Sequence, residues 1–342
     1  MLNYNHLLAM TDDIGMLQFS VLDKPDPNSG YTIDDNARAL IVALMMGNEE
    51  GRSLANQYLD FMVGAQRKDG TWYNMYLNGV YSTWNDSDDC TGRAFLSCCL
   101  AANSSWSEVA NKAYYMLRRT WPSIHRLRSP RAIAYTLLGL SHLNGGVCHE
   151  RQRIIIASTL AQHLIELYKL HHDVQWHWFE DYLTYCNGIL PHGLFAAYRL
   201  TGDKQILKIA YEAINFLISL VFEKSYLIIV GNDGWLHRGR EKPLFDQQPV
   251  DAASTALACY EAYKVLGKKE YLEFSQLACA WYSGSNIHNL PLRNEKTGGC
   301  YDALTAAGVN LNQGAEAVLS LISTDLLLQQ PDMAGENIEK SS

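Results

Sequence analysis

Adjacent acidic side chains recur along the chain where apolar helical segments begin. The pairs are Asp34-Asp35, Asp88-Asp89 and Glu180-Asp181. One acid at a helix start is expected to cap the helix and to complement its dipole. A second, adjacent acid has no capping role and is repelled by the first, so the pairs favour a chemical function. Asp251 and Glu316 stand near the starts of two further helical segments.

Paired carboxylates suit the cleavage of glycosidic bonds. One protonated acid donates to the leaving oxygen, while an ionised carboxylate activates water or attacks the anomeric carbon. Neighbouring acids split their proton affinities, which lets one of them stay protonated near neutral pH. The predicted catalytic residues are Asp34, Asp35, Asp88, Asp89, Glu180 and Asp181, with the first two pairs favoured. The spacing leaves open which two acids form the pair, and whether the reaction inverts or retains the anomeric configuration.

Aromatic residues gather in the same connecting segments, and their flat faces suit stacking on sugar rings. The predicted aromatic subsites are Trp72, Trp84, Trp176, Trp178, Trp235 and Tyr81. Polar residues predicted to bind hydroxyl groups or to orient carboxylates are Arg38, Arg93, Gln247, Gln248, Asp251, Asn312 and Glu316. The two arginines could equally join neighbouring helices through ion pairs with aspartates.

Apolar residues recur at helical spacing through most of the chain, in two alternating kinds of segment. Segments that are apolar nearly all round, and so buried on both sides, are 37–46, 94–102, 132–143, 190–200, 252–266 and 315–328. Amphipathic segments with a solvated face are 50–66, 106–119, 150–170, 203–222 and 269–281, and 2–10 could supply a sixth. This pattern predicts an all-α (α/α)6 toroid of six helical hairpins, favoured over an open solenoid.

The connections between these segments are uneven in length. Short turns follow the buried segments, whereas long loops precede most of them, so the long loops should emerge at one end of the ring. Long loops on a rigid scaffold usually carry function. We expect one toroid domain over residues 1–330 and a polar C-terminal tail over 331–342.

Composition limits the classes of partner. The formal net charge is −8 without a basic run, which disfavours nucleic acid and anionic membranes. No transmembrane segment and no secretory signal stand out, and the eight cysteines form no CxxC pair, so a cytoplasmic protein with reduced thiols is expected. No zinc-binding spacing and no glycine-rich phosphate loop occur, so we predict no metal and no cofactor.

Several of these motifs together resemble a bacterial family of (α/α)6 domains. They are Thr11–Gln18, Tyr31–Leu40, Asp88–Ala94, Trp178–Tyr185, Asp246–Pro249 and Asn310–Glu316. That family is similar to six-hairpin glycosidases, and its members occur alone or joined to glycosyltransferase domains. The resemblance implies a glycosidase-like fold and a glycosyltransferase as partner. It also implies an acid at the position of Cys186, where this chain departs from the pattern.

The leading hypothesis is a glycoside hydrolase acting on an oligo- or polysaccharide. A second hypothesis is a non-catalytic glycan-binding or scaffold domain that works with a glycosyltransferase. A third is a sugar epimerase or isomerase, whose chemistry usually needs two histidines as acid and base. His192 and His288 are the candidates for that pair.

Overall fold

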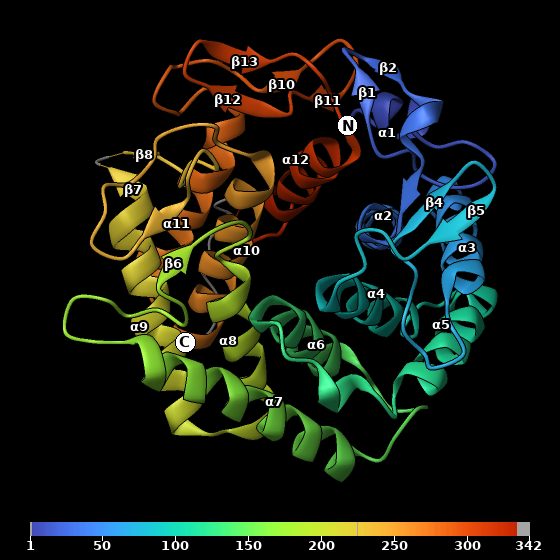
Figure 1. The fold of residues 1–342 in the computed structure, drawn as a ribbon, viewed down its shortest axis with the longest axis horizontal. Helices are drawn as coiled ribbons and strands as arrows, with labels where there is room; N and C mark the ends of the chain where they lie inside the picture. Colours follow the sequence, from blue (N-terminus) through green and yellow to red (C-terminus); the bar gives the residue numbers. More distant parts are fainter. Residues whose placement is uncertain (1, 224, 334–342) are drawn as a thin grey trace, which may run out of the picture.

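The structure, a computed structural model, describes residues 2–223 and 225–333. Its helices alternate between an inner and an outer ring (Figure 1). The inner helices are α2 (Ile33–Met46), α4 (Asp88–Ala101), α6 (Pro130–His142), α8 (Ile189–Thr201), α10 (Pro249–Leu266) and α12 (Ala315–Leu328). The outer helices are α1 (Asn5–Ala9), α3 (Glu49–Ala65), α5 (Ser107–Thr120), α7 (Glu150–His171), α9 (Lys204–Val221) and α11 (Lys269–Ala280).

The ring is closed. Each inner helix contacts the next one along the chain, and α12 contacts α2. The predicted (α/α)6 toroid is therefore confirmed, and the open solenoid is excluded. The sixth outer helix is the short α1, which packs on α12. Residues 334–342 of the predicted tail lie outside the described residues.

The seam between the two ends of the chain is held by hydrogen bonds. The N–H of Ala315 donates to the Gln18 carbonyl at 3.0 Å. The N–H of Gln313 donates to Ser20 Oγ at 2.9 Å. The N-terminal segment thus lies beside the start of α12, which brings residues about 290 positions apart into one neighbourhood.

Small residues allow the inner helices to approach closely. In α6 the side chains from Arg131 to Leu140 are all buried. A Cβ atom placed on Gly193 of α8 would lie 2.7 Å from the Cα of Ala134 in α6. Because real Cβ contacts are not that short, glycine permits this spacing of the two helices.

We expect Gly193→Ala to destabilise the protein by about 1–3 kcal/mol, because overpacking forces the backbone of one helix to move. Chemical denaturation of both proteins measures the difference. Gly202→Asn is the control, since Gly202 has φ 70° and nothing within 4 Å of an added Cβ, and asparagine tolerates that conformation. Equal losses for the two variants would contradict the close-packing argument.

The inner helices α2 and α4 begin four and six residues earlier than their apolar pattern predicts, whereas α12 begins at the predicted residue 315. Thr32 Oγ1 accepts the N–H of Asp35 at 3.0 Å and caps α2. Ser87 Oγ accepts the N–H of Cys90 at 3.2 Å and caps α4. The acid pairs at these positions therefore lie inside the first helical turn rather than before it. There the carboxylates complement the helix dipole without acting as caps.

Left-handed glycines end three inner helices. Gly47, Gly202 and Gly267 have φ values of 64°, 70° and 70° at the ends of α2, α8 and α10. This conformation reverses the chain at once into the following outer helix. It accounts for the short turns at this end of the ring.

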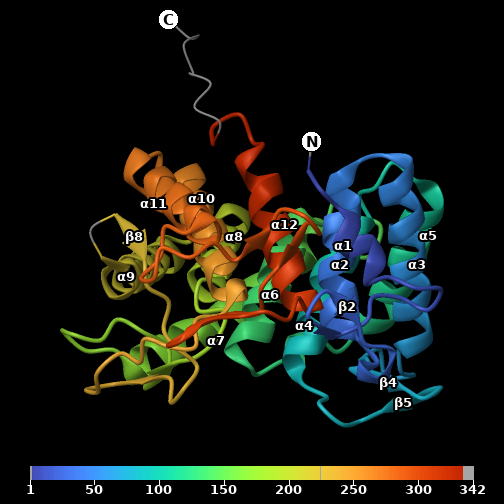
Figure 2. The same cartoon turned by 90° about the horizontal axis from the view of Figure 1, so that it is seen from above.

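The strands are short and lie in the other connections, which run from outer to inner helices. They are β1 (Ser20–Val21), β2 (Lys24–Pro25), β3 (Tyr31–Thr32), β4 (Met75–Leu77), β5 (Val80–Ser82), β6 (Tyr182–Leu183), β7 (Phe222–Glu223), β8 (Tyr226–Leu227), β9 (Leu236–His237), β10 (Arg293–Asn294), β11 (Gly299–Cys300), β12 (Ala303–Thr305) and β13 (Gly308–Asn310). β3, β4 and β5 form a three-stranded sheet, and the remaining strands pair in twos. Figure 2 shows β4 and β5 projecting on the side opposite the C-terminal end of α12. The long loops therefore gather at the N-terminal ends of the inner helices, as predicted.

Over the described residues, no helix combines the length and the apolar character that crossing a membrane requires. All eight cysteines carry free thiols, and seven of them are buried.

Candidate active site

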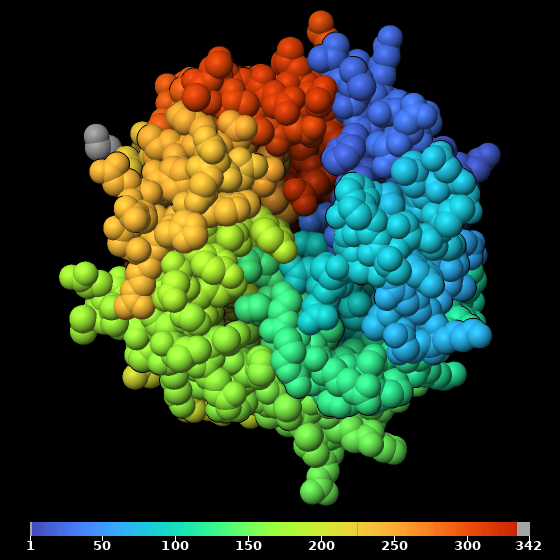
Figure 3. Space-filling model, viewed as in Figure 1, coloured from blue at the N-terminus to red at the C-terminus, as the bar shows by residue number. Residues whose placement is uncertain are grey.

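A cavity of about 710 Å³ opens at the N-terminal ends of the inner helices. Figure 3 shows a hollow near the middle of this face of the ring. Seven acids and two arginines line the cavity: Asp34, Asp35, Asp86, Asp89, Asp246, Asp302, Glu316, Arg38 and Arg93. Its volume falls in the range of small-ligand pockets, and its lining is strongly acidic.

Asp34 is held as an ionised carboxylate. Its Oδ1 lies 2.6 Å from Arg93 Nη1 of α4, and its other oxygen accepts from Asn74 Nδ2 at 3.0 Å. Burial acts to raise the pKa of Asp34, but the guanidinium groups of Arg93 and Arg38 outweigh it and hold the pKa below its usual value. Arg93 also lies over the Tyr135 ring at 4.9 Å, which fixes its orientation.

Asp35 shares a guanidinium with an acid from the other end of the chain. Arg38 Nη1 contacts Asp35 Oδ1 at 3.1 Å, and Arg38 Nη2 contacts Glu316 Oε2 at 2.7 Å. Thr32 Oγ1 donates to the other Asp35 oxygen at 2.6 Å. Burial, together with the charges of Glu316 and Asp34, raises the pKa of Asp35 to about 6. The Glu316 side chain is 43% exposed, so one carboxylate is buried and the other is open to the cavity.

The second acid pair is split by the fold. Asp89 lines the cavity, where Ser129 Oγ and the Tyr185 hydroxyl donate to its two oxygens. Asp88 is exposed and outside the cavity lining, and it accepts the backbone N–H groups of Arg128 at 2.9 Å and Ser129 at 3.3 Å. The structure therefore gives Asp88 a role in anchoring the start of α6, which corrects its predicted catalytic role.

Neither member of the third pair is part of the cavity lining. Glu180 contacts Arg131 at 3.1 Å, and both side chains are largely buried. Asp181 is exposed and contacts His171 at 3.2 Å and Arg238 at 3.4 Å. These ion pairs hold the loop before α8. The prediction that Glu180 and Asp181 are catalytic is corrected accordingly.

Three of the predicted aromatic subsites are core residues. Trp72 and Trp178 are fully buried, and Trp176 is 7% exposed. Trp72 Nε1 donates to the Met62 carbonyl at 2.9 Å, and Trp176 Nε1 donates to the Glu180 carbonyl at 2.8 Å. A buried indole cannot stack on a sugar, so the prediction for these three residues is wrong.

The other predicted aromatic residues also stand outside the cavity lining. Tyr81 packs against Tyr76 with ring centroids 4.6 Å apart, and Trp235 is half-buried. Trp84 is 69% exposed and immediately precedes Asn85, which lines the cavity. Among the predicted aromatic subsites, Trp84 is the one whose side chain is freely accessible at the rim.

Of the seven polar residues predicted to bind hydroxyl groups or to orient carboxylates, four line the cavity and three do not. Arg38, Arg93, Gln248 and Glu316 line the cavity. Gln247 is fully buried and accepts from Trp281 Nε1 at 3.1 Å, whereas Asn312 accepts the N–H of Leu22 at 2.9 Å. Asp251 is buried in the first turn of α10 and accepts the N–H of Asn187 at 3.5 Å. Gln247, Asn312 and Asp251 therefore act in the framework beside the cavity.

Several cavity residues were not predicted as site residues: Phe19, Asn74, Asp86, Tyr185, Asp246 and Asp302. Asp302 accepts the N–H of Gly314 at 2.6 Å, and burial raises its pKa. Asp86 pairs with Arg67 and accepts the N–H of Asn74 at 2.9 Å. Their position in the long loops is the signal that could have indicated them, since those loops form the cavity wall.

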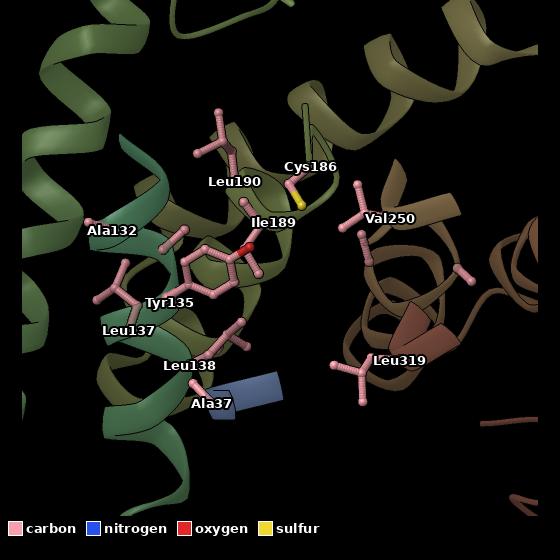
Figure 4. Packing of buried hydrophobic residues seen from close by; sticks show 14 of the residues in the cluster. Ala37, Ala132, Tyr135, Leu137, Leu138, Cys186, Ile189, Leu190, Val250 and Leu319 are labelled. Atoms are coloured by element: carbon pink, nitrogen blue, oxygen red, sulfur yellow. The ribbon is translucent and has the colours of Figure 1, made fainter. Parts of the chain in front are cut away.

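Apolar side chains of the inner helices α6, α10 and α12 face one another in the buried cluster. Figure 4 shows Tyr135 and Leu138 of α6 across from Val250 and Leu319, with Cys186 above Tyr135. Cys186 is 2% exposed, and burial raises the pKa of its thiol. The position where the family resemblance implies an acid thus carries a neutral, buried thiol outside the cavity lining.

The two histidines predicted for epimerase chemistry do not line the cavity. Burial and the neighbouring His142 lower the pKa of His192 to about 3. His288 stacks on Phe245 with centroids 5.0 Å apart, and its Nε2 lies 3.1 Å from the Thr305 carbonyl. Across the described ranges, no group of three or more histidine, cysteine or acidic residues is arranged to hold a metal ion.

No protein-family model matches the chain, and no curated protein matches it in sequence. Solved structures do match its fold over nearly its whole length. The cellobiose 2-epimerase from Bacillus thermoamylovorans is 11% identical with a TM-score of 0.72, covering 95% of this chain and 96% of that one. A D-mannose isomerase is 14% identical with a TM-score of 0.70, covering 95% and 94%.

A GH76 α-mannanase from Bacteroides thetaiotaomicron is also similar. It is 12% identical with a TM-score of 0.58, covering 90% of this chain and 88% of that one. These likenesses establish the toroid fold that the chain shares with enzymes named for action on sugars. At such low identity, the function has to be argued from the residues of the site.

Proposed function

We propose that the chain is a glycoside hydrolase acting on an oligo- or polysaccharide. The observation that carries the proposal is the bridge from Arg38 to Asp35 and Glu316, which places a buried and an open carboxylate together on the cavity. The likeness of the fold to sugar-processing enzymes supports the class of substrate.

In this proposal Asp35 is the proton donor. Its pKa of about 6 keeps a fraction of the side chain protonated near neutral pH, as a general acid requires. The proton passes to the glycosidic oxygen, and the bond from that oxygen to the anomeric carbon breaks. Glu316 then either takes a proton from water as the water attacks the anomeric carbon, or attacks that carbon itself.

Asp34 has a separate, electrostatic role. Arg93 holds it ionised beside Asp35. A fixed negative charge at this place stabilises the positive charge that develops on the sugar ring in the transition state. Asp89, oriented by Tyr185 and Ser129, is positioned to bind a hydroxyl group of the same sugar.

Epimerisation or isomerisation of a sugar is the second candidate function. It is favoured by the TM-scores of 0.72 and 0.70, which exceed the 0.58 of the mannanase. The cavity chemistry weighs against it, because His192 and His288 lie outside the lining and the lining instead carries seven acids. We therefore rank hydrolysis first.

Product analysis in water labelled with heavy oxygen separates the candidates. The wild-type protein is incubated with a library of oligosaccharides, and the products are examined by mass spectrometry and NMR. Hydrolysis yields shorter sugars that carry one heavy oxygen atom. An epimerase or isomerase yields a sugar of the same length with altered stereochemistry or carbonyl position, and a scaffold that serves a glycosyltransferase yields no product. Either of the last two results would overturn the hydrolase proposal.

A further inference from the structure

Four exposed apolar residues lie in the two segments that meet at the seam between the ends of the chain, and one of them, Phe19, also lines the cavity. We call Phe19, Val21, Leu22 and Leu311 the apolar lip. Their exposed fractions are 54%, 63%, 54% and 50%. Large apolar side chains that gather at one place on a surface often mark a binding site.

The lip is built from two segments that are fixed to each other. The N–H of Leu22 donates to Asn312 Oδ1 at 2.9 Å, which places Leu22 beside Leu311 and Asn312. Figure 1 shows β1 and β2 next to the strands and loops that precede α12. The hydrogen bond from Gln313 to Ser20 Oγ fixes the same two segments a second time. Two hydrogen bonds between the segments therefore fix the backbone of the apolar lip, which is not the tip of a single loop.

Phe19 connects the lip to the cavity. Phe19 lines the cavity together with Glu316 and Asp302, and it is half exposed. Its backbone is fixed, because its N–H donates to Ser29 Oγ at 3.1 Å and its carbonyl accepts the N–H of Asp26 at 2.9 Å. A rigid aromatic ring loses little conformational freedom when a ligand stacks on it.

We propose that the apolar lip is a sugar-binding subsite, in which the ring of Phe19 stacks on a pyranose of the glycan outside the acidic cavity. The inference rests on the proposed function, because it takes a carbohydrate as the cavity's ligand. A pyranose presents an apolar C–H face. This face matches an aromatic and aliphatic surface better than it matches the carboxylates that line the cavity. The substrate is accordingly an oligosaccharide or polysaccharide whose chain continues from the cavity over the lip.

The test compares glycans of graded length. Binding of wild type, Phe19→Ala and Phe19→Trp is measured on an array of oligosaccharides from disaccharides upward, and turnover is measured on the same sugars. We expect Phe19→Ala to lose about tenfold in affinity for the longer chains and to keep its affinity for disaccharides. Phe19→Trp should retain wild-type binding, since it restores a stacking surface.

Leu170→Ala is the matched control, since Leu170 is 73% exposed on α7 and outside the cavity lining. Leu170→Ala should leave the dependence of affinity on oligosaccharide length unchanged. Phe19→Ala with wild-type affinity at every length would overturn the subsite, whether or not the protein hydrolyses glycans. Loss of long-chain binding in Phe19→Ala without turnover by wild type would retain the subsite and overturn the hydrolase. Absence of glycan binding by wild type would overturn the subsite.

Discussion

Replacing Asp35 by asparagine is expected to lower turnover by about two to four orders of magnitude, the usual contribution of a general acid. The variant should still bind the glycan, because asparagine keeps the shape of the side chain. Its Oδ1 can still accept from Arg38, while its amide nitrogen can donate to Thr32 Oγ1. Initial rates and binding constants for the same oligosaccharide measure the two effects separately.

The pH profile gives a second readout for the same residue. Asp35 acts while protonated, and its pKa is raised to about 6. Activity should therefore fall as the pH rises through about 6, and this limb of the profile should be absent in Asp35→Asn. An aryl glycoside with a good leaving group needs no protonation, so such a substrate should recover much of the rate lost in the variant.

Asp88→Asn is the matched control, because Asp88 occupies the first turn of α4 as Asp35 occupies that of α2, but lies outside the cavity. It should retain most of the activity. Full activity of Asp35→Asn, or a high-pH limb that persists in this variant, would exclude Asp35 as the proton donor.

The helical framework could be predicted because burial repeats with the period of the helix. All residues of α6 from Arg131 to Leu140 are buried. A helix that is buried on every side has to lie in the inner ring, with other helices covering it. The apolar pattern misses the first turns of α2 and α4, because these turns carry the acid pairs that begin at Asp34 and Asp88. The small size of α1 could not be foreseen, because residues 2–10 mix polar and apolar side chains over nine positions without a signal for where the helix starts.

The site could be predicted only in part, because side-chain direction depends on tertiary packing. Asp88 and Asp89 are neighbours in sequence, yet the helix turns by about 100° per residue, and only Asp89 reaches the cavity. Trp72 stands in a loop but folds back to donate to Met62 in the core. The contact between Arg38 and Glu316 joins residues 278 positions apart, and no local pattern specifies that pairing.

The second large effect concerns stability. Asp251 is buried, and burial together with the charge of Glu316 raises its pKa to about 7, although the N–H groups of Asn187 and Cys186 act in the opposite direction. Because the folded state holds this proton more tightly than the unfolded state, the stability associated with it is present at low pH. That stability is lost as the pH rises from about 4, where the unfolded group titrates, to about 7.

Asp251→Asn should therefore flatten the dependence of the free energy of unfolding on pH. A shift of one pKa unit corresponds to about 1.4 kcal/mol, so the loss avoided by the variant at pH 8 reaches up to about 4 kcal/mol. Urea denaturation at pH 4, 6 and 8 measures the curves. At pH 8 the variant should be the more stable protein, and at pH 4 this advantage should vanish, because Asp251 is then protonated in the wild type.

Asp13→Asn, which changes an exposed acid, serves as the control. It should leave the dependence of the free energy of unfolding on pH unchanged. Parallel curves for wild type and Asp251→Asn would contradict the prediction. They would mean that the Asp251 carboxylate is ionised in the folded protein at the same pH as in the unfolded chain, so that the N–H groups of Asn187 and Cys186 fully offset its burial. In that case the decline of stability with pH would have to come from other acids, and Asp35, with its pKa raised to about 6, would be the first to test.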